Sequence, residues 1–312
     1  MKVFDARATA AALPFDRLLP ALRALFVQGC ELPPRHVHTL APGGPVSLLM
    51  PAWLPGRYYA LKVVNIAAGN GALGLPGVMG SVLLFDAATG RPLALLDGGE
   101  VTSRRTAAAS ALAASMLARP DASHLLLIGA GQVARLLPAA FASALPIRRV
   151  TVWARDARRA AALADELSAQ GFDADAVATA GLPAAAAGAQ IVSCATPATE
   201  PVLLGRWLQP GSHLDLIGSF TPAMREADDA CFKGARLYVD TEEALQKSGE
   251  LLGPLSRGVF STADVVGTLA ALCRGTAPGR QTAGERTVFK SVGTALEDLA
   301  AAMLAYEEGA AS

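Results

Sequence analysis

Residues 124–137 read HLLLIGAGQVARLL, and this stretch decides the fold. HLLLI is an apolar run typical of a buried strand, and the residues after the glycines have the spacing of a helix. Between them Gly129, Gly131 and Ala134 fill the pattern G-x-G-x-x-A, which lets a backbone approach a pyrophosphate at a helix N-terminus. Glycines also form ordinary turns, but the strand before the pattern and the helix and second strand after it together predict dinucleotide binding.

Strand and helix patterns alternate from His124 onward. The apolar runs RVTVW (149–153), AQIVSCA (189–195), SHLDLIG (212–218) and RLYVD (236–240) predict strands, and helices are predicted near 132–144 and 156–169. Such alternation predicts an α/β fold with a doubly wound parallel sheet of the Rossmann type.

The chain before this block has a different pattern. Residues 36–101 contain short alternating runs broken by glycine and proline, which predict an antiparallel sheet. TSRRTAAASALAASMLA (102–118) predicts a helix with Thr102 as a candidate N-cap. The final helical pattern, residues 292–308, could pack back on the first block. We therefore predict one domain at 1–119, completed by 290–312, and a Rossmann domain at 120–289.

Composition excludes several classes of partner. The chain has 27 basic and 27 acidic side chains, so binding to nucleic acid or to an anionic membrane surface is not predicted. Its apolar segments are too short to span a bilayer, and Asp5 and Arg7 interrupt any signal peptide, so we expect a cytoplasmic protein. The four cysteines and four histidines have no metal-ligand or CxxC spacing, so no metal site or disulfide is predicted.

The second predicted strand ends in the sequence VTVWARDARR (150–159), which bears on the choice of dinucleotide. NAD-binding units carry an acid at this strand end for the ribose hydroxyls, and Ala154 occupies the expected position. Arg155, Arg158 and Arg159 follow, within reach of a 2′-phosphate. The alternative is a solvated helix start whose arginines pair with Asp156. The missing acid favours NADPH, with NADH the less favoured cofactor.

Three stretches carry a resemblance to a known family: GSVLLFDAATGRPLALLDGGEVTSRRTAAASALAASMLA (80–118), LLLIGAGQVA (125–134) and RTVFKSVGTALEDLAAAMLAY (286–306). With them the chain resembles the ornithine cyclodeaminase and mu-crystallin family over nearly its whole length. The resemblance implies a Rossmann domain plus a discontinuous α+β domain that binds substrate and forms a homodimer. The family includes ornithine cyclodeaminases, alanine dehydrogenases, reductases of cyclic imino acids, and a crystallin that binds NADPH and thyroid hormone.

The resemblance also implies roles for individual residues. Arg35, Lys62 and Arg105 match basic positions that hold a substrate carboxylate, and Arg105 is expected at a helix N-terminus, where an anion gains further stabilisation. Arg104 competes with Arg105 but is expected on a different face of the helix. The positions expected to contact the cofactor, beside Gly129, Gly131, Arg155 and Arg158, are Thr106, Gln132, Val133, Thr196, Ile217 and Ser291.

Two departures from the cyclodeaminase pattern point to the reaction. Phe220, in LIGSFTPAMRE (216–226), replaces the aspartate of a GGD run, and VSLLMP (46–51) lacks a glutamate that the cyclodeaminases carry before MP. Amine oxidation and cyclisation need a base, whereas a preformed cyclic imine needs mainly a hydride and an anchor for its carboxylate. The GSFTPAMRE stretch resembles the ketimine reductase subgroup.

We therefore predict an NADPH-dependent ketimine reductase of proline metabolism, an oxidoreductase acting on C=N. Its substrate would be Δ1-pyrroline-2-carboxylate, with the six-membered Δ1-piperideine-2-carboxylate as an alternative, and its product L-proline or L-pipecolate. Phe220 would form an apolar wall, and Lys62 or a bound water would donate the proton, if the imine needs one. The alternatives are an ornithine cyclodeaminase, an alanine dehydrogenase-like enzyme and a mu-crystallin-like ligand-binding protein.

Overall fold

The structure, a computed structural model, describes residues 1–311. Its contacts divide the chain into two compact units: unit 1 comprises residues 1–106 and the segment that begins at Thr294, and unit 2 comprises residues 107–293. The segment 290–312, predicted to complete the first domain, includes Ser312, which lies outside the described residues. Within residues 1–311 no helix combines the length and the apolar character that a membrane crossing requires.

Unit 1 is built on a six-stranded sheet in the order β1-β6-β5-β4-β3-β2. Strands β2 to β6 pair antiparallel, as predicted for residues 36–101, and β1 joins β6 in parallel. The strands are β1 (Lys2–Phe4), β2 (His36–Thr39), β3 (Val46–Leu54), β4 (Tyr58–Ile66), β5 (Val78–Asp86) and β6 (Pro92–Asp97). The helices are α1 (Ala6–Ala12), α2 (Phe15–Gln28), the 3₁₀ helix η1 (Ala68–Leu73), the first part of α3 (Gly98–Leu117) and α10 (Ala295–Ala311).

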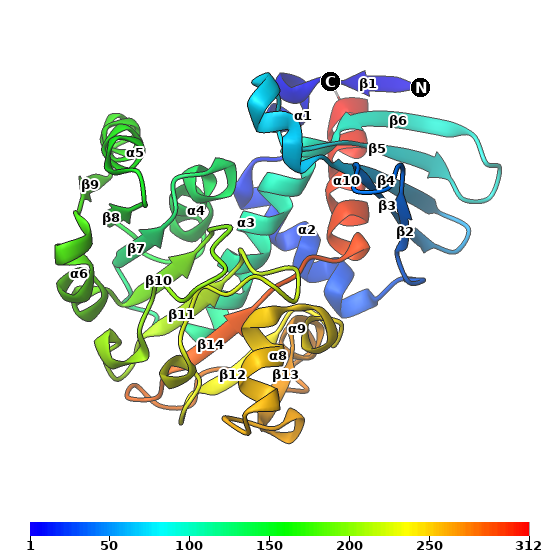
Figure 1. Cartoon of the computed structure of the whole chain (residues 1–312). Helices are drawn as coiled ribbons and strands as arrows, with labels where there is room; N and C mark the ends of the chain where they lie inside the picture. The colour runs from blue at the N-terminus through cyan, green and yellow to red at the C-terminus, as the bar shows by residue number, and fades with distance from the viewer. Residues whose placement is uncertain (312) are drawn as a thin grey trace. The chain divides into compact units, whose positions relative to one another are not determined.

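One face of the central strands of unit 1 is buried. Residues alternate along β3, β4 and β5, so that Met50, Ala52, Ala60, Val64 and Val82 are all nearly inaccessible. The C-terminal helix α10, red in Figure 1, packs against these strands and against α2. The last helix of the chain thus packs on the sheet of the first block.

Helix α3 begins earlier than predicted. It starts at Gly98, directly after β6, and the side chain of Asp97 accepts a hydrogen bond from the backbone N of Glu100. A Cβ at position 98 would lie 2.4 Å from the backbone of Gly80, so only glycine fits this start. The prediction of Thr102 as N-cap is wrong because Asp97 already caps the helix. Arg105 consequently lies inside α3, and its expected place at a helix N-terminus is also wrong.

Unit 2 is built on an eight-stranded sheet in the order β13-β12-β14-β11-β10-β7-β8-β9, with every pairing parallel. The strands are β7 (His124–Ile128), β8 (Arg149–Trp153), β9 (Asp173–Ala176), β10 (Ile191–Cys194), β11 (His213–Leu216), β12 (Arg236–Val239), β13 (Val265–Thr268) and β14 (Thr287–Lys290). The α/β fold with a doubly wound parallel sheet is confirmed.

Helices connect most of these strands. They are α4 (Gln132–Ala142), α5 (Ala157–Ala169), α6 (Leu182–Gly188), α7 (Ala244–Lys247), α8 (Gly249–Ser256) and α9 (Leu269–Arg274). Short 3₁₀ helices lie at η2 (Thr179–Gly181), η3 (Gly205–Trp207), η4 (Asp229–Cys231) and η5 (Thr262–Asp264). Helices α4 and α5 correspond to the two predicted near 132–144 and 156–169.

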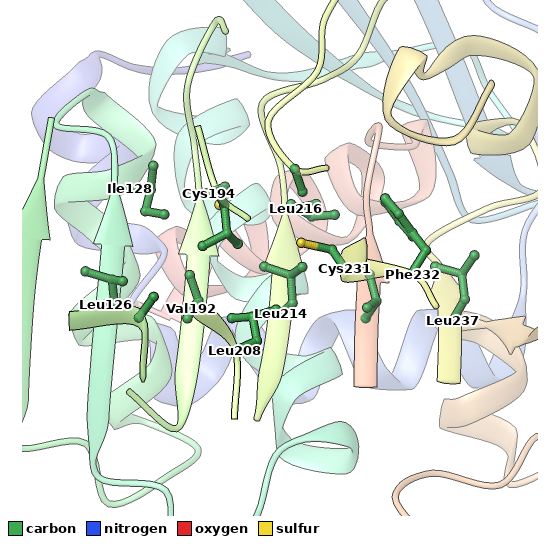
Figure 2. Packing of buried hydrophobic residues seen from close by; sticks show 14 of the residues in the cluster. Leu126, Ile128, Val192, Cys194, Leu208, Leu214, Leu216, Cys231, Phe232 and Leu237 are labelled. Atoms are coloured by element: carbon green, nitrogen blue, oxygen red, sulfur yellow. The ribbon is translucent and has the colours of Figure 1, made fainter. Parts of the chain in front are cut away.

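A layer of apolar side chains on one face of the unit 2 sheet forms a core, shown in Figure 2. Leu126 and Ile128 come from β7, Val192 and Cys194 from β10, and Leu214 with Leu216 from β11. Leu182 and Ala186 of α6 and Leu251 of α8 belong to the same cluster. Burial of these side chains fixes the strands, and therefore also fixes the loops that leave their carboxyl ends.

The contacts place the unit boundaries at 106/107, inside α3, and at 293/294, whereas the sequence pattern predicts 119/120 and 289/290. β14 pairs with both β11 and β12 and so belongs to unit 2, and α10 begins a few residues later in unit 1. The functional division into a substrate-binding and dimerisation domain and a dinucleotide-binding domain stays a prediction.

Candidate functional site

Unit 1 contains a buried cluster of four charged side chains. The Nζ atom of Lys62 lies 2.7 Å from Oδ2 of Asp298, and Arg105 Nη1 lies 2.5 Å from Oε2 of Glu297. The Nε atom of Arg105 lies 3.2 Å from Oδ1 of Asp298, which joins the two pairs. Two of the predicted carboxylate-binding residues, Lys62 and Arg105, are thus brought together by the same aspartate.

The positions of these side chains follow from local structure. Lys62 lies on the buried face of β4, between Ala60 and Val64. Glu297 and Asp298 lie in the first turn of α10, where the helix dipole favours negative charge. The exposed fractions of the Lys62 and Asp298 side chains are both 1%. Such burial requires paired charges, and each cation here has an acidic partner.

Burial also changes the acidity of Lys62. Desolvation lowers the pKa of its ammonium to about 8, the charge of Arg105 acts in the same direction, and the charge and hydrogen bond of Asp298 oppose them. The group therefore stays largely protonated near pH 7 but releases its proton more readily than an exposed lysine. It can bind an anion and can also act as a proton donor.

Arg104 and Arg35, the other two basic candidates, have different surroundings. Arg104 contacts Glu100 at 3.2 Å, donates to the carbonyl of Leu13 and lies over the ring of Phe15. Its expected place on a different face from Arg105 is therefore confirmed. Arg35 is half-buried immediately before β2, and its role in holding a carboxylate stays a prediction.

In unit 2 the glycine-rich turn has the geometry that a pyrophosphate needs. Gly129 has a φ of +125°, and a Cβ there would lie 2.6 Å from the carbonyl oxygen of Ala195. Gly131 is the N-cap of α4, and a Cβ there would meet nothing within 4 Å. Gln132 and Val133 follow in the first turn of that helix, exposed and half-buried respectively. Open space at a helix N-terminus with positive dipole fits the phosphates of a dinucleotide.

The three arginines at the end of β8 have different surroundings. Arg158 is 96% exposed and lies 3.8 Å from Asp156, which caps α5. Arg159 Nη2 donates to the carbonyl oxygen of Ala130, within the glycine-rich turn, at 3.3 Å. Arg155 is exposed at the strand end. The structure therefore brings Arg159 to the turn, while the pairing of Arg158 with Asp156 agrees with the solvated alternative.

The remaining predicted contact residues lie in different settings. Thr196 follows β10 and donates twice to the carboxylate of Glu226. Ile217 and Ser291 are buried directly after β11 and β14, where their backbone N atoms donate to Cys194 and Leu216. Thr106 is half-buried in α3, and Phe220 is 45% exposed. Their roles stay predictions.

Sequence reasoning missed the buried acids of both units. In unit 1 these are Glu297 and Asp298, and in unit 2 they are Asp215, Glu226, Asp240 and Glu250, which surround Lys290. Burial raises the pKa of Asp215 and of Glu250 to about 7 and lowers that of Lys290. Among residues 1–311 no group of three or more potential ligands could hold a metal ion.

The model of the ornithine cyclodeaminase/mu-crystallin family matches residues 16–312. The chain belongs to this family. A Δ1-pyrroline-2-carboxylate reductase of Paracoccus denitrificans is 46% identical over 276 residues, 87% of each chain. The ketimine reductase mu-crystallin of Mus musculus is 36% identical over 247 residues, 79% of this chain and 74% of its own.

A solved structure shares the fold over the whole chain. The structure of Thermococcus litoralis Δ1-pyrroline-2-carboxylate reductase in complex with NADH and L-proline has a TM-score of 0.94 and 32% identity. The match covers 100% of this chain and 98% of that one. The family resemblance and the fold class predicted from the sequence are both confirmed.

Proposed function

We propose that this protein reduces a cyclic imino acid, Δ1-pyrroline-2-carboxylate or its six-membered homologue Δ1-piperideine-2-carboxylate, to L-proline or L-pipecolate, with NADPH as the hydride source. The enzyme class, an oxidoreductase acting on C=N, is that of the reductase relatives. The observation that carries the proposal is the buried pair of cations Lys62 and Arg105, held side by side by Asp298. Such a pair suits a small carboxylate.

Substrate binding would use the charges of unit 1. Lys62 and Arg105 would hold the carboxylate of the imino acid and fix the orientation of its ring. Arg35 would add a third cation. Phe220 would offer an apolar surface to the flat imine ring. A carboxylate at this position would instead favour a substrate that carries an ammonium group. Asp298 already holds both cations side by side, which fixes their orientation before the anion binds.

A nicotinamide cofactor, when bound, supplies hydride to the carbon of the C=N bond. The chain itself would handle the proton. Lys62, whose pKa is lowered to about 8, can donate a proton to the ring nitrogen, and Asp298 holds the ammonium in place. An imine that arrives already protonated needs no such donor, so Lys62 would then serve only as an anchor.

The preference for NADPH rests on the end of β8. No acid stands at Ala154, and Arg155, Arg158 and Arg159 lie at the start of α5. A 2′-phosphate could pair with these exposed guanidinium groups, whereas an acid would repel it. NADH, which the Thermococcus litoralis complex contains, is the alternative.

We propose a homodimer formed through the outer face of the unit 1 sheet. On the face away from α10, Trp53, Tyr59 and Phe85 are half-buried. The ring centroid of Tyr59 lies 6.3 Å from that of Trp53 and 5.5 Å from that of Phe85. Leu61 and Val63 continue the same face. Aromatic and aliphatic side chains on an uncovered sheet face are typical of an interface between subunits. Localisation in the cytoplasm stays a prediction.

The test is direct. Purified protein is incubated with NADPH and each cyclic imine while nicotinamide absorbance is followed, and the product is identified as L-proline or L-pipecolate. Parallel reactions contain ornithine with NAD, or pyruvate and ammonia with NADH. The proposal is supported if imine reduction is faster than the reaction of ornithine and faster than that of pyruvate with ammonia. Turnover only of ornithine, or only of pyruvate, would replace it with the lyase or the alanine dehydrogenase, and tight binding without turnover would indicate a binding protein.

A further inference from the structure

A single buried carboxylate joins two loops at the carboxyl edge of the unit 2 sheet. Oε1 of Glu226 accepts hydrogen bonds from the backbone N and Oγ1 of Thr196, at 2.7 and 2.9 Å, and Oε2 accepts from the backbone N of Gly218 at 2.6 Å. Glu226 is 0% exposed. Thr196 lies just after β10 and Gly218 just after β11, so this side chain sets the spacing of the two loops.

The loop after β10 packs tightly against two glycines. A Cβ at Gly218 would lie 1.9 Å from the carbonyl oxygen of Thr196, and a Cβ at Gly129 would lie 2.6 Å from that of Ala195. Residues 195 and 196 are therefore packed between two glycine backbones. Because the glycine-rich turn lies on one side and Gly218 on the other, any shift of Thr196 moves the turn or the β11 loop as well.

A second buried carboxylate, that of Glu250, fixes the backbone at Glu226. The carboxylate of Glu250 accepts hydrogen bonds from the backbone N of Glu226 and of Ala227, at 2.7 and 2.9 Å. Lys290 donates to the carbonyl of Leu216, and its charge opposes the rise in the pKa of Glu226 that burial causes. Backbone donors and a nearby cation together stabilise the ionised carboxylate in the interior.

The place of this carboxylate in the sheet points to a ligand. β7, the first strand of the unit, lies between β8 and β10, so the direction of the sheet connections reverses beside it. In open parallel sheets a ligand binds outside the carboxyl ends of the strands at such a reversal. Thr196 leaves β10 at this point, next to the open N-terminus of α4.

We propose that Glu226 is a positioning residue for the nicotinamide cofactor. It acts through Thr196 and Gly218, whose backbones it fixes beside the glycine-rich turn. Thr196 and Gly218 donate all three hydrogen bonds that its carboxylate accepts, so Glu226 can act without contacting the cofactor itself. The inference rests on the proposed function for the identity of the cofactor, but it concerns binding and does not depend on which imine is reduced.

The main variant is Glu226→Gln, which keeps the size of the side chain. Its amide oxygen can accept from only one of the two loops, and its NH₂ group then faces the N–H of the other. We expect the Kd for NADPH, measured by the fluorescence of the nucleotide, to rise about tenfold. The KM for NADPH should rise with it, whereas the KM for the imine should change little. NADH is titrated in parallel.

The matched control is Asp228→Asn. The carboxylate of Asp228 also accepts a loop N–H, that of Gly205 at 2.8 Å, whereas Thr196 and Gly218 donate to Glu226 and not to Asp228. Both variants should lose thermal stability, and only Glu226→Gln should lose cofactor affinity. A Glu226→Gln protein that binds NADPH within about twofold of the parent would overturn the inference.

If Glu226→Gln does not fold, Glu226→Asp provides the second test, since it keeps the negative charge but shortens the side chain that reaches Thr196 and Gly218. We expect a several-fold rise in Kd, and unchanged binding would overturn the inference. Failure of the proposed function has a different signature: the parent would bind NADPH but reduce no cyclic imine, while Glu226→Gln would still weaken binding.

Discussion

Lys62 and Asp298, which lie 236 positions apart in the chain, form an ion pair in which Nζ and Oδ2 are 2.7 Å apart and both side chains are 1% exposed. The aspartate keeps a proton on a lysine that burial would otherwise tend to neutralise. The pair would therefore set the pH range in which Lys62 could bind and protonate the proposed substrate.

Replacing Asp298 with asparagine should move the pH profile of the enzyme. The pKa of Lys62 is about 8, and loss of the opposing charge lowers it further. Activity that requires the ammonium falls as pH rises through this pKa, so the alkaline limb of kcat/KM should shift to lower pH, by about one unit or more. The measurement is the rate of imine reduction between roughly pH 6 and pH 10. An unshifted limb would show that Lys62 is not the titrating group.

Arg105→Ala should damage turnover far more than Arg104→Ala. Arg105 is buried against two acids, and removing one partner of a buried pair costs about 3–5 kcal/mol, whereas a partly exposed pair such as Arg104–Glu100 contributes about 1 kcal/mol or less. Arg105→Lys keeps the charge and separates loss of folding from loss of binding. Steady-state kinetics with the imine check this, and equal penalties at positions 104 and 105 would mean that the carboxylate binds elsewhere.

NADPH should be preferred over NADH, and Arg155→Ala should narrow the preference. A charge-assisted contact to a phosphate contributes about 1.5–3 kcal/mol, so its loss should weaken NADPH binding about tenfold or more while NADH binding is unchanged. Arg148→Ala, an exposed arginine before the opposite end of β8, is the control. Equal affinity of the unmodified protein for both nucleotides would contradict the assignment.

Ornithine should not be deaminated. Removal of hydride and a proton from an amine needs a base beside it, and the phenyl ring of Phe220 cannot accept a proton or pair with an ammonium. Phe220→Asp should weaken imine reduction before it confers deamination, because the second acid, before MP in residues 46–51, is missing as well. Ammonia release from ornithine plus NAD, at a rate comparable to imine reduction, would reject the assigned reaction class.

The fold could be predicted from the sequence because its signals are local. The strand, glycines and helix at 124–137 lie within a few residues of one another, and periodicity identifies α4, α5 and α10. The start of α3 was misplaced because Gly98 and Gly99 have low helix propensity, although Asp97, which caps the helix, lies directly before them. Threonine is also a common N-cap residue, so the local sequence allowed Thr102 as well.

The site was only half predictable for a similar reason. Lys62 and Arg105 were identified through the family resemblance, but the acids that hold them follow in an alanine-rich helix, where Glu297 and Asp298 look like ordinary first-turn residues. Likewise, the sequence around Glu226 does not show that its carboxylate accepts a hydrogen bond from Thr196, 30 positions earlier. Partners that meet only through folding leave no pattern in a single sequence.

The placement of β14 has a consequence for synthesis of the protein on the ribosome. This strand lies between β11 and β12 in the middle of the unit 2 sheet, and α10, which follows it, packs on the sheet of unit 1. Neither unit can therefore complete its core until the last part of the chain has left the exit tunnel. The nascent chain exposes two unfinished sheets until then, and a stop codon shortly before Thr287 should deprive both units of stable structure at once, rather than release one folded domain.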